Sequence, residues 1–316
     1  MDDDASPFVA VGTAYALTDA SNVGGDAPIL ALAERARKIL ATATDDLPRG
    51  LLTNALGNFQ MSIDAKLADE LLAEATQLLR KANDPRWTAP VQNRFLTAWV
   101  MNSRESEHEI LSLAEEHGDL ISPVRLRVGQ TAFKVLAEEY DDVISSTETL
   151  STVDDWAKIM FLLYRMQAER ATGRPEAALE TIKRFTAMPS AITDGWKGWN
   201  KALAHLQLGD VDAAIATFSA PGAFNQDLPP ASDRANVAWF WSMIAERRGE
   251  YGSAAVLMGF ASALSKKASV SLLAFDQRLV EESRSAIREA LGEKVYGETL
   301  EHGAKIAWED LPLVHP

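Results

Sequence analysis

The chain has 316 residues, of which 47% are hydrophobic and 24% charged, and its 45 acidic and 31 basic residues give a net charge of −14. It contains no cysteine, which excludes disulfides, thiolate nucleophiles and cysteine-based zinc sites. The acidic balance argues against direct nucleic-acid binding, because phosphate backbones are bound chiefly by clusters of Lys and Arg. A surface that only keeps the chain soluble is the simpler explanation of the charge.

The targeting signals point to the cytoplasm. The sequence has no apolar run of about 18 residues, so it predicts no membrane-spanning helix. Its first residues, Met1-Asp2-Asp3-Asp4, are acidic, whereas a secretory signal begins with basic residues. We therefore expect a cytoplasmic protein.

Segments rich in Ala, Leu, Glu, Arg and Lys alternate with proline and glycine along the whole chain, and this alternation predicts an all-α fold. Residues 8–16 alternate weakly enough to resemble a strand, but an isolated strand would have nothing to pair with. A final turn is expected near 308–313. The predicted helices cover residues 7–18, 27–43, 49–61, 64–82, 89–102, 105–117, 123–138, 141–149, 153–172, 175–187, 194–208, 211–219, 232–248, 252–264, 267–291 and 293–306.

Four short helix starts recur at spacings of 35, 36 and 40 residues. They are Tyr140-x-x-Val143, Pro175-x-x-Ala178, Val211-x-x-Ala214 and Tyr251-x-x-Ala254. A period of this size is typical of stacked helix–turn–helix repeats. Gly173, Gly209 and Gly249 precede three of these starts, where a left-handed glycine would end the preceding helix.

This pattern resembles the tetratricopeptide repeat, in which a Gly-x-Tyr turn precedes an alanine of the second helix. The resemblance implies a right-handed α-α superhelix of about seven helical hairpins followed by C-terminal capping helices. We expect a single repeat domain over residues 1–316. Within it, residues 1–120 would form divergent hairpins, 121–265 the clearer repeats, and 266–316 the C-terminal cap.

The last repeats carry a more specific set of residues. The segment 254–264 (Ala-Ala-Val-Leu-Met-Gly-Phe-Ala-Ser-Ala-Leu) is followed by Leu291-Gly292-Glu293 and Glu301-x-Gly303. This set is similar to the end of the helical-repeat region in bacterial transcriptional regulators of the ATP-binding LuxR type and the antibiotic-regulator (SARP) type. A purely structural reading is also available. In it, Gly259 allows two helices to approach, Gly292 ends a helix, and Tyr296, Ile306 and Trp308 cover the last apolar face.

The chain departs from those regulators in two respects. It has no Gly-x-x-x-x-Gly-Lys-Ser/Thr loop for nucleotide phosphates, and no basic recognition helix is evident. The LuxR-type regulators usually place their DNA-binding domain after the repeats. Because this sequence ends at Pro316, just past the last repeat segment, we expect it to fit the SARP-type order of domains better. The chain would be either a sensor fragment of a longer regulator or a free-standing relative.

No pattern for catalysis or metal binding is evident. The five histidines (His108, His117, His205, His302 and His315) form no His-Glu-x-x-His motif, and no Gly-x-Ser-x-Gly turn occurs. We expect no cofactor, no metal and no enzymatic activity, although an unrecognised enzyme in the N-terminal third is the weakest alternative.

The sequence instead predicts a binding or regulatory module that holds a protein, a peptide or a small effector in its concave groove. Trp199 and Trp239 each lie ten residues before a turn glycine, a place that faces the groove in tetratricopeptide repeats. Ordinary packing of these large side chains is the alternative. Self-association of a free-standing scaffold is the alternative function. The predicted ligand-groove residues are Trp196, Trp199, Trp239, Arg125 and Arg170.

Overall fold

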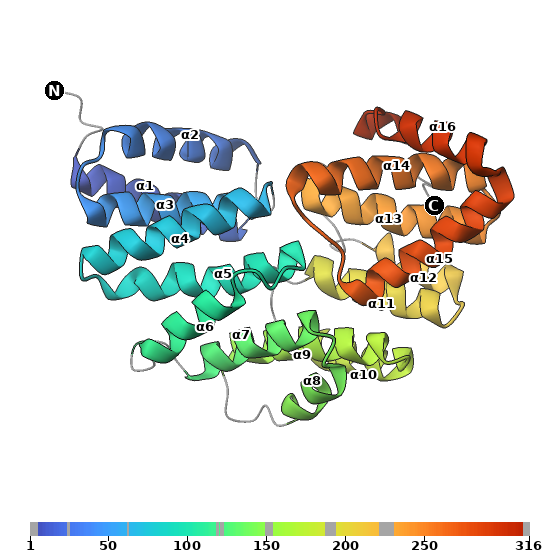
Figure 1. Ribbon diagram of the computed structural model, residues 1–316, viewed down its shortest axis with the longest axis horizontal. Helices are drawn as coiled ribbons and strands as arrows, with labels where there is room; N and C mark the ends of the chain where they lie inside the picture. The colour runs from blue at the N-terminus through green and yellow to red at the C-terminus, as the bar shows by residue number, and fades with distance from the viewer. Residues whose placement is uncertain are drawn as a thin grey trace. The chain divides into compact units, whose positions relative to one another are not determined.

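The computed structural model describes residues 6–23, 26–61, 63–117, 120, 123–148, 154–186, 194–220 and 231–311. Every regular element within these ranges is helical, with sixteen α-helices and short 3₁₀ turns (Figure 1). The all-α prediction is confirmed. None of the helices in these ranges has the length and apolar character needed to cross a membrane.

The chain divides into two compact units, Met1–Phe133 and Lys134–Pro316. In both units most helices pack against the helix that follows them in the chain, which is consistent with a helical arrangement of hairpins. A single repeat domain over residues 1–316 stays a prediction.

The first unit consists of helices that mostly pack against the next helix in the chain, and ion pairs around one buried arginine link three of them. Arg94 is 2% exposed. Its guanidinium donates to Asp69 at 2.9 Å and to Glu109 at 2.9 Å, which ties three successive helices (α4, α5 and α6) together. The helices are α1 (Pro7–Val23), α2 (Asp26–Thr42), α3 (Asp46–Gln60), α4 (Ala65–Lys81), η2 (Pro85–Trp87), α5 (Thr88–Met101), α6 (Glu107–Glu116) and α7 (Pro123–Leu136), which runs across the boundary.

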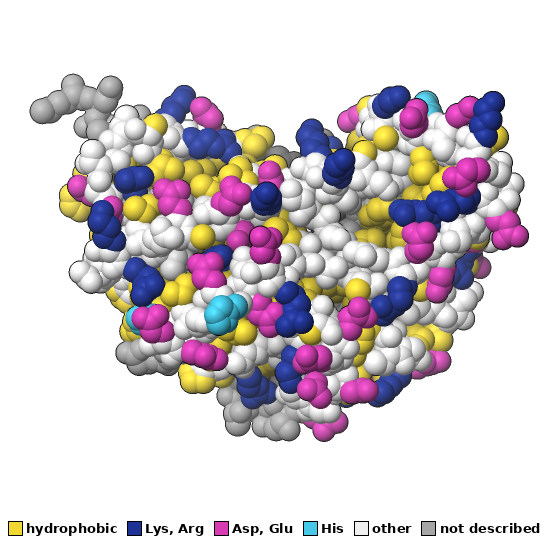
Figure 2. Space-filling model, in the orientation of Figure 1, with side chains coloured by type: hydrophobic (Ala, Val, Ile, Leu, Met, Phe, Trp, Pro, Cys, Tyr) yellow, Lys and Arg dark blue, Asp and Glu magenta, His cyan; other side chains and the backbone are white. Residues whose placement is uncertain are grey.

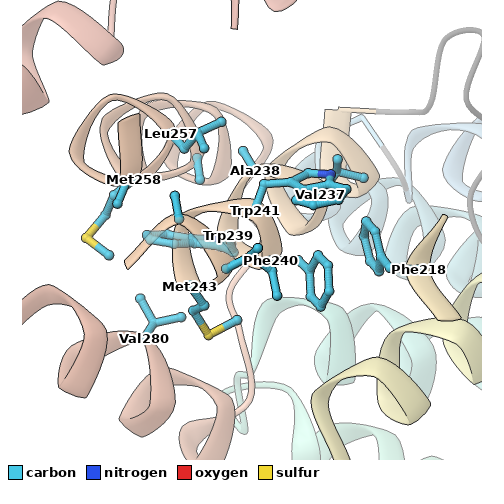
Figure 3. Close-up of a cluster of buried hydrophobic side chains, with 14 of the residues drawn as sticks. Phe218, Val237, Ala238, Trp239, Phe240, Trp241, Met243, Leu257, Met258 and Val280 are labelled. Carbon is cyan, nitrogen blue, oxygen red and sulfur yellow. The ribbon is translucent and has the colours of Figure 1, made fainter. Parts of the chain in front are cut away.

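The second unit contains the segment whose sequence predicts the clearer repeats, and the C-terminal helices. Its main core joins residues of α11 to α16, and Figure 3 shows part of this core around α13. Its helices are α8 (Tyr140–Ser146), α9 (Asp155–Ala171), α10 (Pro175–Thr186), α11 (Asp194–Gln207), α12 (Val211–Phe218), α13 (Ala231–Arg247), α14 (Tyr251–Ala268), α15 (Ala274–Leu291), α16 (Glu293–Gly303) and η4 (Trp308–Asp310).

The turn glycines take the conformation expected from the repeat pattern. Gly173, Gly209 and Gly249 have φ values of 72°, 78° and 77°, in the left-handed region that glycine adopts without a steric penalty. The next helix begins two residues after each of them. Asp210 caps α12, because its carboxylate accepts a hydrogen bond from the Ala213 amide at 3.0 Å. The equivalent turn before α8 uses Glu138, at φ 60°.

The C-terminal glycines allow a close helix crossing, as the structural reading expected. A Cβ atom on Gly259 would lie 2.2 Å from the Leu300 carbonyl oxygen, and one on Gly303 would lie 2.1 Å from that of Val256. Helices α14 and α16 can therefore pack backbone to backbone. Gly292, at φ 76°, ends α15. Tyr296 is buried in the core, and Ile306 and Trp308 pack against it.

One predicted helix is wrong in its extent. The sequence predicted a continuous helix over 267–291, but α14 extends to Ala268 and α15 begins only at Ala274. The break occurs because Ser269 adopts a left-handed conformation (φ 54°), and the Val270 amide then donates to the Ser265 carbonyl. This arrangement ends a helix in the same way as a C-terminal glycine does.

Candidate binding surface

Two of the three tryptophans predicted to line the groove lie inside the core. Trp199 of α11 is 3% exposed and Trp239 of α13 is 6% exposed. Trp199 packs edge-to-face against Phe218 of α12, with ring centroids 6.3 Å apart. Trp239 lies among the buried side chains around α13 (Figure 3). The burial of both side chains agrees with the alternative of ordinary core packing. Their role in ligand binding stays a prediction.

Arg170 of α9 is fully buried and hydrogen-bonded to three side chains. Its guanidinium donates to Asp276 at 2.6 Å, to Asn200 at 2.8 Å and to Gln207 at 3.1 Å. The Phe275 ring lies 5.2 Å from the guanidinium carbon, a distance suited to a cation–π contact. A buried arginine with these partners is neutralised and oriented within the protein itself.

Helix α15 supplies two of the groups around Arg170, and it also packs against α13, α14 and α16. Asp276 reaches α9, while Phe275 meets the Tyr140 ring of α8 edge-to-face, with centroids 5.9 Å apart. Farther along α15, Val280 lies beside Met243 of α13 (Figure 3). Asp276 and Phe275 of the same chain therefore lie directly against the Arg170 guanidinium. A role of Arg170 in ligand binding stays a prediction.

The remaining predicted residues are not brought into this cluster by any described contact. Arg125 lies in the first unit, on α7, and is half-buried. Trp196 belongs to α11, but its side chain lies outside the described residues.

An open cleft lies between α10 and α11 on the second unit. Its volume is about 780 Å³, within the range of sites that hold a small ligand or several side chains of a peptide. The apolar residues Leu179 and Ile182 line it from α10. The charged and polar residues that line it are Glu176, Glu180, Lys183, Lys201 and His205.

The charged residues around the cleft differ in whether they form ion pairs with other described residues. Lys183 is paired with Glu180 one helical turn earlier. Lys201 is exposed, and neither it nor Glu176 forms an ion pair with another described residue. Glu176 lies in the first turn of α10, where the helix dipole favours a negative charge. The cleft therefore presents one acidic and one basic group beside its apolar wall.

His205 contributes a neutral imidazole to the same cleft. Burial lowers the pKa of His205 below its ordinary 6.5; Asp210 acts against this shift, and the Lys201 ammonium adds to it. At neutral pH the ring can donate from one nitrogen and accept at the other. The cleft thus combines apolar contact, hydrogen bonding and two opposite charges, which suits recognition of a peptide segment.

Sequence reasoning missed this cleft, because it considered His205 only as a possible metal ligand and assigned no role to Leu179 or Lys201. The available signal was the spacing. Four of the lining residues lie three or four positions apart along α10, or next to one another, and so share one face: Glu176, Leu179, Glu180 and Lys183. On α11, Lys201 and His205 are four residues apart. Among the described part of the chain, no group of three or more His, Asp or Glu side chains could hold a metal ion.

No protein-family model and no curated protein matches the sequence.

Proposed function

We propose that the chain is a cytoplasmic, non-catalytic binding module built as a right-handed α-α superhelix of the tetratricopeptide type. The matched left-handed turns at Gly173, Gly209 and Gly249 support the repeat register. The module binds a peptide segment of a partner protein. The observation that carries this proposal is the cleft between α10 and α11, with its apolar wall and with Glu176 and Lys201, which form no ion pair with any other residue that the structure describes.

The cleft favours a particular kind of segment. Leu179 and Ile182 offer contact to one apolar anchor residue. Lys201 on α11 attracts an acidic residue of the segment, and Glu176 on α10 attracts a basic residue. Because the two charges differ in sign, they also fix the direction in which the segment lies.

The resemblance of the C-terminal segment to regulator repeats supports a biological role for this binding. Occupancy of the cleft would bias a neighbouring regulatory module between two states, which is an allosteric mechanism. A small effector is the alternative occupant of the same cleft. The binding experiment below detects it, because a small effector in this cleft would compete with the peptide.

The test is a selection of random 12-residue peptides displayed against the full chain, followed by affinity measurements with the enriched peptides. We expect Leu179→Asp to weaken binding at least tenfold. Lys201→Glu should weaken peptides that carry an acidic residue and restore peptides in which that residue is replaced by lysine. Leu208→Asp is the matched control, because Leu208 is exposed in the turn that follows α11 and does not line this cleft.

Two results would reject the proposal. One is enriched peptides whose affinity for the Leu179→Asp variant equals that for the unchanged chain. The other is a Lys201→Glu effect that charge reversal in the peptide does not restore.

A further inference from the structure

A second cleft of the second unit is lined by the turns that follow α9 and α11 and by α15. Its volume is about 500 Å³, which suits a small molecule. Gly173 and Gly209 line it from the two turns, and Leu279 and Glu282 line it from α15. This turn cleft shares no lining residue with the cleft between α10 and α11, so it is a separate candidate site.

Two opposite charges line the turn cleft. Arg247 is the last residue of α13 and Glu282 lies on α15, and both side chains are exposed. Neither forms a hydrogen bond or an ion pair with the other, or with any other residue that the structure describes. The neighbouring Glu281, by contrast, is paired with Arg284 at 2.9 Å. The turn cleft therefore offers both a guanidinium and a carboxylate to a ligand.

The two charges are distinguished by their place in a cavity with apolar walls. Charge alone does not distinguish them, since acidic and basic side chains are mixed over the visible face in Figure 2. Three leucines line the same cavity: Leu206 is buried, Leu279 is partly buried and Leu208 is exposed. A molecule that meets both charges in this cavity also meets an apolar surface.

Gln207 holds one wall of the turn cleft in place. Its Oε1 accepts a hydrogen bond from Arg170 at 3.1 Å, and its Nε2 donates to the Arg170 carbonyl at 3.2 Å. Arg170 in turn donates to Asp276 of α15 at 2.6 Å. This buried network joins the end of α11 to the start of α15. The cleft is thus formed before a ligand binds, which lowers the entropic cost of binding.

The two kinds of charge suit two different ligand groups. Helices α9 and α11 end two residues before Gly173 and Gly209, and the C-terminus of a helix carries a partial negative charge that favours a cation. Together with the Glu282 carboxylate, these helix ends favour an ammonium group. The Arg247 guanidinium can bind a carboxylate through two parallel hydrogen bonds.

We propose that the turn cleft binds a free amino acid with an apolar side chain. Arg247 binds its carboxylate and Glu282 binds its ammonium group. The leucines of the cleft contact its side chain. A zwitterion neutralises both protein charges at once, whereas a simple anion or cation neutralises only one of them. Because Arg247 belongs to α13 and Glu282 to α15, the bound amino acid also links these two helices.

Isothermal titration calorimetry of the full chain tests the proposal. The probes are L-valine, L-leucine, L-isoleucine, L-methionine and L-phenylalanine, each up to about 10 mM. We expect saturable binding of at least one probe and a rise in the unfolding midpoint at saturation. Two analogues of the tightest probe each lack one charge: its amide and the acid without its amino group. Both should bind at least tenfold more weakly than the amino acid.

Neutral substitutions assign each charge to its partner. Arg247→Gln should weaken the amino acid at least tenfold and leave the weak binding of its amide unchanged. Glu282→Gln should weaken the amino acid equally and leave the deaminated acid unchanged. Both residues are exposed, so the unfolding midpoint of the free variants should not change. Leu208→Asp should also weaken binding, whereas Leu179→Asp is the control because it alters only the cleft between α10 and α11.

Several results would overturn the proposal. One is the absence of saturable binding by every probe, which would show that the two charges are only solvated. Another is an affinity that either neutral substitution leaves unchanged, or that the singly charged analogues match. A loss of binding in Leu179→Asp but not in Leu208→Asp would place the amino acid in the cleft between α10 and α11 instead.

Discussion

The Arg170 guanidinium and the Asp276 carboxylate lie 2.6 Å apart, although 106 residues separate them in the chain. Both side chains are almost completely buried, at 0% and 7% exposure. The pair joins α9, an early helix of the second unit, to α15. It therefore holds this C-terminal helix against a helix that lies far earlier in the chain.

We expect Asp276→Ala to lower the free energy of unfolding by about 3–5 kcal/mol, because it leaves a buried guanidinium without its counter-charge. Urea unfolding measures this change. Asp141→Ala is the matched control: the Asp141–Arg174 pair has a similar length, 3.0 Å, but both side chains are exposed, so its loss should cost less than about 1 kcal/mol. Equal effects of the two substitutions would show that the Arg170 pair does not secure α15.

The close crossing of α14 and α16 gives a second prediction. Gly259→Ala places a methyl group against the Leu300 carbonyl, and overpacking of this kind destabilises by about 1–3 kcal/mol or more. Gly297→Ala in α16 meets nothing within 4 Å and should stabilise by about 0.5–1 kcal/mol, because alanine is the better helix former. Thermal or urea unfolding of both variants tests the crossing, which a stable Gly259→Ala protein would contradict.

The repeat turns can be tested at Gly209, whose φ is 78° and whose missing Cβ faces open space. Gly209→Ala should destabilise by about 1–2 kcal/mol, since only the backbone conformation opposes the methyl group. Gly209→Asn should cost less, because asparagine enters the left-handed region more readily. If alanine and asparagine have the same effect on the urea midpoint, the left-handed turn is not the cause.

The sequence predicted the features that depend on neighbouring residues. The helices, the left-handed turns and the close approach at Gly259 follow from residue type and spacing within a few tens of residues. It did not predict that α15 would cover Arg170. Asp276 resembles an ordinary first-turn carboxylate, and its partner is 106 residues away. The same limit explains why the cleft was missed, because α10 and α11 each supply only part of it.

The imidazole of His205 makes stability depend on pH in a defined window. Burial lowers the folded-state pKa of His205 below its ordinary 6.5, so the unfolded chain binds a proton more readily. Stability from this group is complete above about pH 6.5 and is lost as the pH falls from there to the folded-state pKa. Carboxylates with lowered pKa, such as Glu109, titrate below their ordinary 4.5 and act in a more acidic range.

We therefore expect the urea midpoint to fall between about pH 7 and pH 5, and to fall less in His205→Gln. The two proteins are compared at each pH in the same buffer and salt. A midpoint profile that is identical in both proteins over this window would contradict the assignment.

The central proposal is that a partner segment binds between α10 and α11. Hydrogen–deuterium exchange of the full chain, with and without a saturating selected peptide, tests it most directly. We predict added protection confined to residues 175–186 and 194–207, and no such protection in the Leu179→Asp variant. Protection that instead falls on α15, or that persists in that variant, would contradict it.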